Sequence, residues 1–139
     1  MAETLQRNIF QRLLGLSATS KPLDDQCWTF SDGKIEINLN LAKELTAIGG
    51  AVRLEKKQLP ENILVIHGTD DKYYAFNNKC KHMGRRMDPV PGTQTIQCCS
   101  IGKTTYDYDG KAISGSGKGK LCKYPVEKSL DRLVIRLKS

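Results

Sequence analysis

The sequence of 139 residues predicts an all-β fold, an antiparallel β-sandwich or small barrel, preceded by one short helix. Three observations support this. Short apolar segments follow one another at close spacing, turn signals such as Asp32-Gly33 separate them, and only one segment has helical periodicity. No apolar run approaches the roughly 18 residues of a membrane-spanning helix, so no membrane span is expected.

The helical segment comes first, at residues 3–14. Its apolar side chains recur at spacings of three and four, which is typical of an amphipathic helix. The stripe consists of Leu5, Ile9, Leu13 and Leu16. Residues 17–22 are a polar linker. We therefore expect two parts, a helix and linker at residues 1–22 and a β-domain at residues 23–139.

Eight or nine short strands are predicted after the linker. They are the segments 27–30, 34–39, 51–55, 62–68, 72–76, 95–99, 104–108, 111–113 and 130–137. Asp32-Gly33 is a strong hairpin signal between the first two. Residues 41–45 are expected to form at most one or two helical turns before Gly49-Gly50. In the last strand, alternating apolar residues predict one buried face.

The net charge of +7 is concentrated in residues 79–123, which hold nine basic and three acidic side chains. A basic field of this kind favours an acidic protein partner. No nucleic-acid-binding motif is present, so no nucleic acid is expected. The odd number of cysteines, five, suits a reducing compartment, and no signal peptide is apparent, so a cytoplasmic location is expected.

A pair of soft metal ligands, Cys80-x-His82, stands in the segment "NKCKHMGRR". Sixteen residues separate His82 from Cys99, and the turn "VPGTQ" between them predicts a hairpin that brings the two segments together. A thiolate and an imidazole at this spacing can reach one metal ion or a pair of bridged irons. A fourth donor is expected three residues after Cys99, where the sequence has Gly102.

These residues resemble the Rieske family, in which C-x-H and C-x-x-H boxes hold a two-iron two-sulfur (2Fe-2S) cluster. Cys80-Lys-His82 matches the first box, and Cys99 matches the cysteine of the second. Tyr106-Asp107 matches the aromatic–Asp pair that follows, and Gly110 the hairpin glycine. The resemblance covers roughly residues 27–138. It implies a Rieske-like fold with two cluster-loop hairpins, Cys80, His82 and Cys99 as metal ligands, and Tyr106 as a hydrogen-bond donor to the Cys99 sulfur.

The second box departs from the family pattern, because Gly102 replaces its histidine and Lys103 follows. The proline usual in a third loop is also replaced, by "SGSGKGK". Three residues are alternative donors. His67 is expected to be an exposed histidine at a strand end, away from the loops. Cys98 should face away from Cys99, as neighbours in a strand do. Cys122, on the altered third loop, is the more interesting candidate.

Three functions follow from these patterns. The first is a Rieske-type electron carrier, or a component of an oxidoreductase system rather than a stand-alone enzyme. The second is a Rieske-fold binding or structural module without a cluster. The third is a mononuclear zinc site built from the three predicted ligands and water. In the first, an acidic redox partner would dock on the basic residues of the loops, which are Lys79, Lys81, Arg85, Arg86 and Lys103.

Overall fold

Twelve strands and two single 3₁₀ turns occur in the part of the chain that the structure, a computed structural model, describes: residues 21–55, 59–78, 87–90, 93–98, 105–114 and 122–137. The predicted N-terminal helix, residues 3–14, lies outside this part. The elements are η1 (Asp25–Cys27), β1 (Trp28–Ser31), β2 (Lys34–Asn38), η2 (Lys43–Leu45), β3 (Ala51–Leu54), β4 (Ile63–His67), β5 (Tyr73–Asn77), β6 (Met87–Pro89), β7 (Thr95–Cys98), β8 (Thr105–Asp107), β9 (Ala112–Ser114), β10 (Lys123–Tyr124), β11 (Val126–Ser129) and β12 (Arg132–Arg136).

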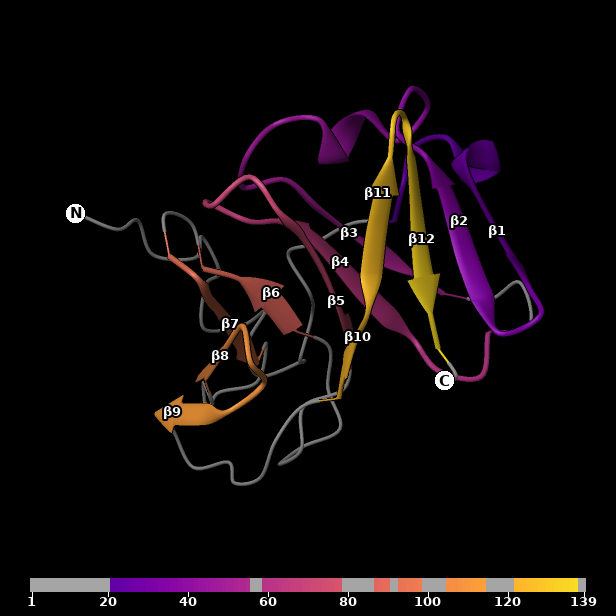
Figure 1. The fold of residues 1–139 in the computed structure, drawn as a ribbon. Helices are drawn as coiled ribbons and strands as arrows, with labels where there is room; N and C mark the ends of the chain where they lie inside the picture. Colours follow the sequence, from indigo (N-terminus) through magenta and orange to yellow (C-terminus); the bar gives the residue numbers. More distant parts are fainter. Residues whose placement is uncertain are drawn as a thin grey trace.

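The strands form three antiparallel sheets of four strands each (Figure 1). We call them the outer sheet (β1-β2-β12-β11), the middle sheet (β10-β5-β4-β3) and the small sheet (β6-β7-β8-β9). The predicted all-β, antiparallel fold is confirmed. No helix in the described ranges is long and apolar enough to cross a membrane.

Two hydrophobic cores lie between the three sheets. The first fills the space between the outer and middle sheets and contains, among others, Trp28, Ile35, Ile37, Val52, Leu54, Ile63, Val65, Leu133 and Ile135. The second lies between the middle and small sheets and consists of Leu64, Ile66, Phe76, Ile96, Tyr106 and Tyr108. The middle sheet therefore contributes side chains to both cores.

Strand β4 shows why a middle sheet suits this sequence. All five of its residues are buried. Because neighbouring side chains in a strand point to opposite faces, Ile63 and Val65 enter the first core while Leu64 and Ile66 enter the second. A continuous apolar run, rather than an alternating one, is what a strand covered on both faces requires.

The hairpin between β1 and β2 turns at Asp32-Gly33, as predicted. Both residues have positive φ, 51° and 74°, which is the conformation of a two-residue type I′ turn. Gly110 also has a positive φ, 88°, in the turn after β8. The glycines at these two turns relieve the steric cost that a side chain would carry there.

The predicted number of strands, eight or nine, was too low. β6, β10 and β11 were missed, and each is short or largely exposed. Cys27 was expected within the first strand and instead ends η1, directly before β1. Its side chain lies in the first core, where it acts as a small buried hydrophobe.

Candidate functional site

The predicted ligands Cys80, His82 and Cys99 lie outside the described residues, as do Gly102 and the five basic loop residues. The described residues nevertheless fix where the segments that carry them join the sheets. We call residues 79–86, 99–104 and 115–121 the first, second and third connecting segments.

The small sheet brings four ends of these segments together. Met87, where the first segment ends, pairs with Cys98, where the second begins. Thr105, where the second segment ends, pairs with Gln97 on one side and with Ser114 on the other. Ser114 is the residue from which the third segment leaves. All three connecting segments therefore attach at the same end of the small sheet.

The two remaining ends meet on the middle sheet. The backbone N–H of Asn77 donates to the carbonyl of Cys122 across 2.9 Å. The first segment leaves one residue beyond Asn77, and the third ends directly before Cys122. Glu61 reinforces this junction, since its carboxylate accepts hydrogen bonds from the Asn77 side chain at 2.6 Å and from the Tyr124 hydroxyl at 2.7 Å. The first and third segments are thus anchored side by side.

Tyr106 is the one predicted site residue that the structure describes. It lies on β8, two residues beyond the second connecting segment, and its side chain is fully buried in the second core. The neighbouring Asp107 has a different role: its carboxylate accepts hydrogen bonds from the backbone N–H groups of Asp109 and Lys111, both at 2.9 Å. The aromatic residue anchors the strand in the core, and the carboxylate shapes the turn that follows.

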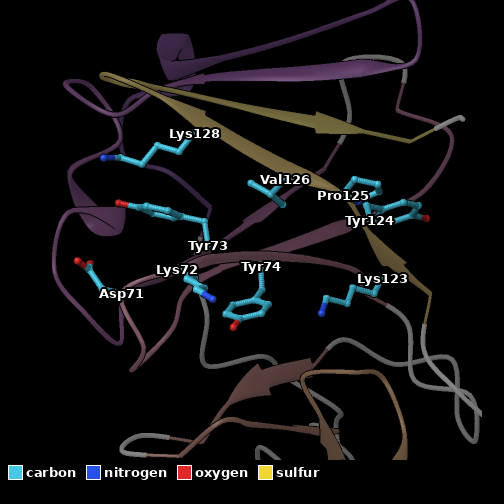
Figure 2. A pocket seen from close by; sticks show the side chains of 9 residues that line it. All are labelled: Asp71, Lys72, Tyr73, Tyr74, Lys123, Tyr124, Pro125, Val126 and Lys128. Carbon is cyan, nitrogen blue, oxygen red and sulfur yellow. The ribbon is translucent and has the colours of Figure 1, made fainter.

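Further aromatic rings extend the second core toward the surface. The ring of Tyr108 lies 4.7 Å from that of Tyr74 and 5.8 Å from that of Phe76. Burial raises the pKa of Tyr108, so its hydroxyl stays protonated at physiological pH. The ammonium group of Lys123 lies 5.1 Å from the centre of the Tyr74 ring (Figure 2), a cation–π contact at the edge of this group.

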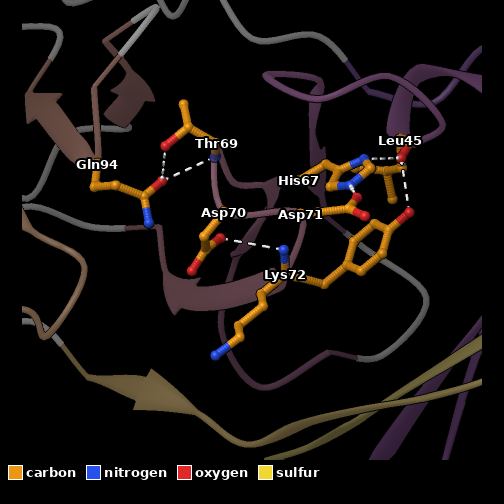
Figure 3. A network of polar contacts seen from close by, with 8 residues as sticks. Leu45, His67, Thr69, Asp70, Asp71, Lys72 and Gln94 are labelled. Atoms are coloured by element: carbon orange, nitrogen blue, oxygen red, sulfur yellow. Dashed lines mark hydrogen bonds and ion pairs between the residues drawn. The ribbon is translucent and has the colours of Figure 1, made fainter.

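Polar contacts join the small sheet to the middle sheet (Figure 3). The side-chain oxygen of Gln94 accepts hydrogen bonds from the Thr69 N–H at 2.9 Å and from the Thr69 hydroxyl at 2.8 Å. Thr69 belongs to the turn between β4 and β5, and Gln94 to the connection before β7. These bonds help to fix the orientation of the small sheet, and with it the end where the connecting segments attach.

His67 was predicted to be exposed, and this prediction was wrong: only 4% of its surface is accessible. Its Nδ1–H donates to the Leu45 carbonyl at 2.9 Å, and its Nε2 lies 2.6 Å from a carboxylate oxygen of Asp71 (Figure 3). The ring also stacks on Tyr73, with 4.3 Å between centroids. No local pattern in the sequence indicates that the carbonyl of Leu45, the last residue of η2, would lie against this strand end.

His67 is consequently a poor candidate for a metal donor. Both ring nitrogens already have polar partners. It pairs with Tyr73 at the start of β5, whereas the first connecting segment follows the opposite end of that strand, at Asn77. His67 thus lies at the end of β5 opposite the point where the first connecting segment leaves.

Two cysteines remain as candidates for the fourth donor, Cys98 and Cys122, and the structure describes the side chain of Cys122 alone. Cys98 ends β7, and its side chain lies outside the described part. Cys122 is exposed and carries a free thiol beside Asn77. Cys80 follows Asn77 by three residues, which an extended chain spans in at most about 11 Å. Among the described residues, no group of three or more His, Cys, Asp or Glu side chains is arranged to hold a metal ion.

Comparisons with known proteins agree with the arrangement of the sheets. The family described as the Rieske [2Fe-2S] domain matches residues 39–125, well over half of the chain. A search of curated protein sequences finds no significant match.

Solved structures share the fold at low sequence identity. A chain from the complex of reduced oxygenase and oxidized ferredoxin in carbazole 1,9a-dioxygenase has a TM-score of 0.62 and 14% identity, covering 78% of this chain and 97% of that one. The ferredoxin of carbazole 1,9a-dioxygenase from Nocardioides aromaticivorans IC177 has a TM-score of 0.58 and 16% identity, covering 69% and 91%. The apo quaternary ammonium Rieske monooxygenase CntA has a TM-score of 0.54 and 22% identity, covering 69% of this chain and 31% of the monooxygenase.

Proposed function

The chain belongs to the Rieske [2Fe-2S] domain family, and we propose that it is an electron-transfer domain whose cluster site lacks one of the four protein donors usual in that family. The observation that carries the proposal is the attachment of all three connecting segments at one end of the small sheet, next to the buried Tyr106. Cys80, His82 and Cys99 lie on the first two of these segments and within the matched residues.

The donor set does not fit a complete Rieske centre. Such a centre needs two cysteines for one iron and two histidines for the other. Cys80 and Cys99 supply the cysteine pair, but His82 has no counterpart because Gly102 has no side-chain donor. One coordination position therefore has to come from water, from another side chain or from a partner. A cluster held in this way is expected to be labile.

The partner in this proposal is an acidic redox protein. The basic residues of the first and second segments, Lys79, Lys81, Arg85, Arg86 and Lys103, supply complementary charge around the predicted ligands. The structural neighbours include a ferredoxin and the complex of an oxygenase with a ferredoxin, which makes a role in an oxidoreductase system the natural one to test.

Gly102 also favours a second candidate function, a Rieske-fold binding module without a cluster. In that case Cys80, His82 and Cys99 retain no shared ligand role, and the altered sequence "SGSGKGK", residues 114–120, has no cluster to shield. The two functions share the fold and differ in iron content, so a measurement of iron separates them.

The decisive experiment compares the native chain with Gly102→His after anaerobic purification and reconstitution. We expect little and labile iron and sulfide in the native chain, and nearly two of each per chain in the variant. Loss of the cluster from the variant should be about tenfold slower or more, since changes around metal ligands typically alter metal affinity by at least that factor. Gly102→Ala is the matched control, because it removes the glycine without adding a donor. If the histidine variant, like the alanine variant, holds no iron, the cluster-free module is the correct function.

Two further variants assign roles within the same experiment. Cys122→Ser is expected to leave the iron content of the native chain unchanged, because water fills the open position; a clear loss of iron would identify the thiol as the fourth donor. In the Gly102→His background, Tyr106→Phe is expected to shift the reduction potential, because it removes the hydroxyl proposed to donate to the Cys99 sulfur. An unchanged potential would remove Tyr106 from the site.

A further inference from the structure

A groove of about 360 Å³ runs along the edge of β5 (Figure 2). Three lysines, three tyrosines and a few other side chains line it. The lining residues are Asp71, Lys72, Tyr73, Tyr74, Lys123, Tyr124, Pro125, Val126 and Lys128. They come from the start of β5 and from the stretch that runs through β10 into β11.

The groove exists because β10 is too short to cover β5. The ladder between them has only two residue pairs, Lys123 with Phe76 and Tyr124 with Ala75. After Pro125 the chain enters β11, which pairs with β12 of the outer sheet instead. On the edge of β5 that faces away from β4, Tyr73 and Tyr74 therefore border a groove and not another paired strand.

The charge of the lining favours an anionic occupant. Lys72, Lys123 and Lys128 are exposed, and the single acidic residue of the lining, Asp71, is engaged with His67. No carboxylate in the described ranges forms an ion pair with Lys128. Lys123 does have one acidic neighbour, Asp109, at 3.7 Å, and the Asp109 side chain is largely exposed.

The tyrosines of the groove do not offset this positive charge. Burial raises the pKa of Tyr73, and burial followed by the hydrogen bond to Asp70 raises that of Tyr74. Both are therefore neutral at physiological pH and present ring faces and edges rather than negative charge. Beside them, Val126 adds apolar surface.

The spacing of the lysines argues for an extended occupant. Lys123 and Lys128 are five residues apart on an extended stretch, or roughly 17 Å at the rise of a β-strand. A compact anion such as phosphate reaches only one end of this span. We propose that the groove binds an extended acidic segment of a protein partner, with carboxylates at the lysines and an apolar side chain over Tyr74 and Val126. This site does not depend on whether a cluster is bound.

The test uses the full chain and a fluorescein-labelled peptide, Glu-Asp-Phe-Glu-Asp-Glu, followed by fluorescence anisotropy. Each exposed contact is expected to contribute modestly, so Lys72→Glu combined with Lys128→Glu should weaken binding about tenfold. Lys34→Glu is the control for a single charge reversal, because Lys34 is exposed on β2 outside the groove. It should change the affinity of the native chain less than about twofold, and less than Lys128→Glu alone does.

Three results would overturn the proposal. Equal weakening by Lys34→Glu and Lys128→Glu would mean that the peptide senses only net charge. Displacement of the peptide by inorganic phosphate or benzoate at similar concentration would indicate a small-anion site. Tighter binding of a short single-stranded DNA than of the peptide would point to nucleic acid. Chemical-shift changes confined to Tyr73, Tyr74 and Val126 on peptide addition would support the groove directly.

Discussion

The two cores of this protein are built differently. The first, between the outer and middle sheets, draws buried residues from seven strands in addition to residues near η1 and η2. The second has six buried members among the residues that the structure describes, and three of them, Leu64, Ile66 and Phe76, belong to the middle sheet. From the described part of the small sheet and its turn come Ile96, Tyr106 and Tyr108. The part of the molecule that carries the predicted ligands thus packs on one face of the middle sheet, whose other face belongs to the first core.

The largest expected effect tests this arrangement directly. Ile35→Ala removes a fully buried side chain from the first core and should lower the free energy of unfolding by about 2–5 kcal/mol, a large part of the 5–15 kcal/mol typical of a domain. Ile96→Ala, equally buried in the second core, should mainly loosen the small sheet. Denaturation combined with hydrogen exchange distinguishes the two. Equal, global loss of protection in both variants would mean that the cores unfold as one unit.

A second prediction concerns the loop of residues 46–50, between η2 and β3. A Cβ at position 50 would lie 1.9 Å from the carbonyl oxygen of Glu44, so Gly50→Ala must displace backbone and should cost about 2–4 kcal/mol of stability. Gly49→Ala is the matched control: a Cβ there meets nothing within 4 Å, and only its φ of +90° is unfavourable, at about 1 kcal/mol. Thermal denaturation that ranks the two in the opposite order would contradict the close approach.

The smallest expected effect concerns the hydrogen bond between Tyr74 and Asp70, in the hairpin that joins β4 to β5. The hydrogen bond from the Tyr74 hydroxyl is the main reason why the pKa of Asp70 lies below its ordinary value of 3.8. The stabilisation is therefore present above that ordinary value and is lost as the pH falls through the lower pKa of the folded protein. In Tyr74→Phe the pKa of Asp70 should return toward 3.8, as measured by NMR titration. An unchanged pKa would assign the effect to the backbone N–H of Lys72 instead.

The sequence predicted the framework well because its strands carry strong signals. Asp32-Gly33 marked the first hairpin, and the alternation around Leu133 and Ile135 marked the last strand. The missed strands lack such signals for physical reasons. β6 has three residues and ends in a proline, β10 has only two, and β11 exposes most of its side chains, so none shows a periodic apolar face.

The candidate site was predicted from a motif, and motifs report chemistry rather than position. The pattern of Cys80, His82 and Cys99 identified the family, which the match over residues 39–125 shows. Where their side chains lie stays a prediction. The error at His67 has a different origin: its burial depends on the Leu45 carbonyl, more than 20 residues earlier in the chain. A contact at that separation leaves no local periodic signal.

Strand β4 has one further consequence. This single strand separates the two cores, with Val65 packed in the first and Leu64 in the second. A slip of one residue along its neighbours would exchange every side chain between the two cores at once. The register of β4 is therefore constrained by packing on both of its faces. The strand ends from which the connecting segments leave are positioned by that register, whatever those segments bind.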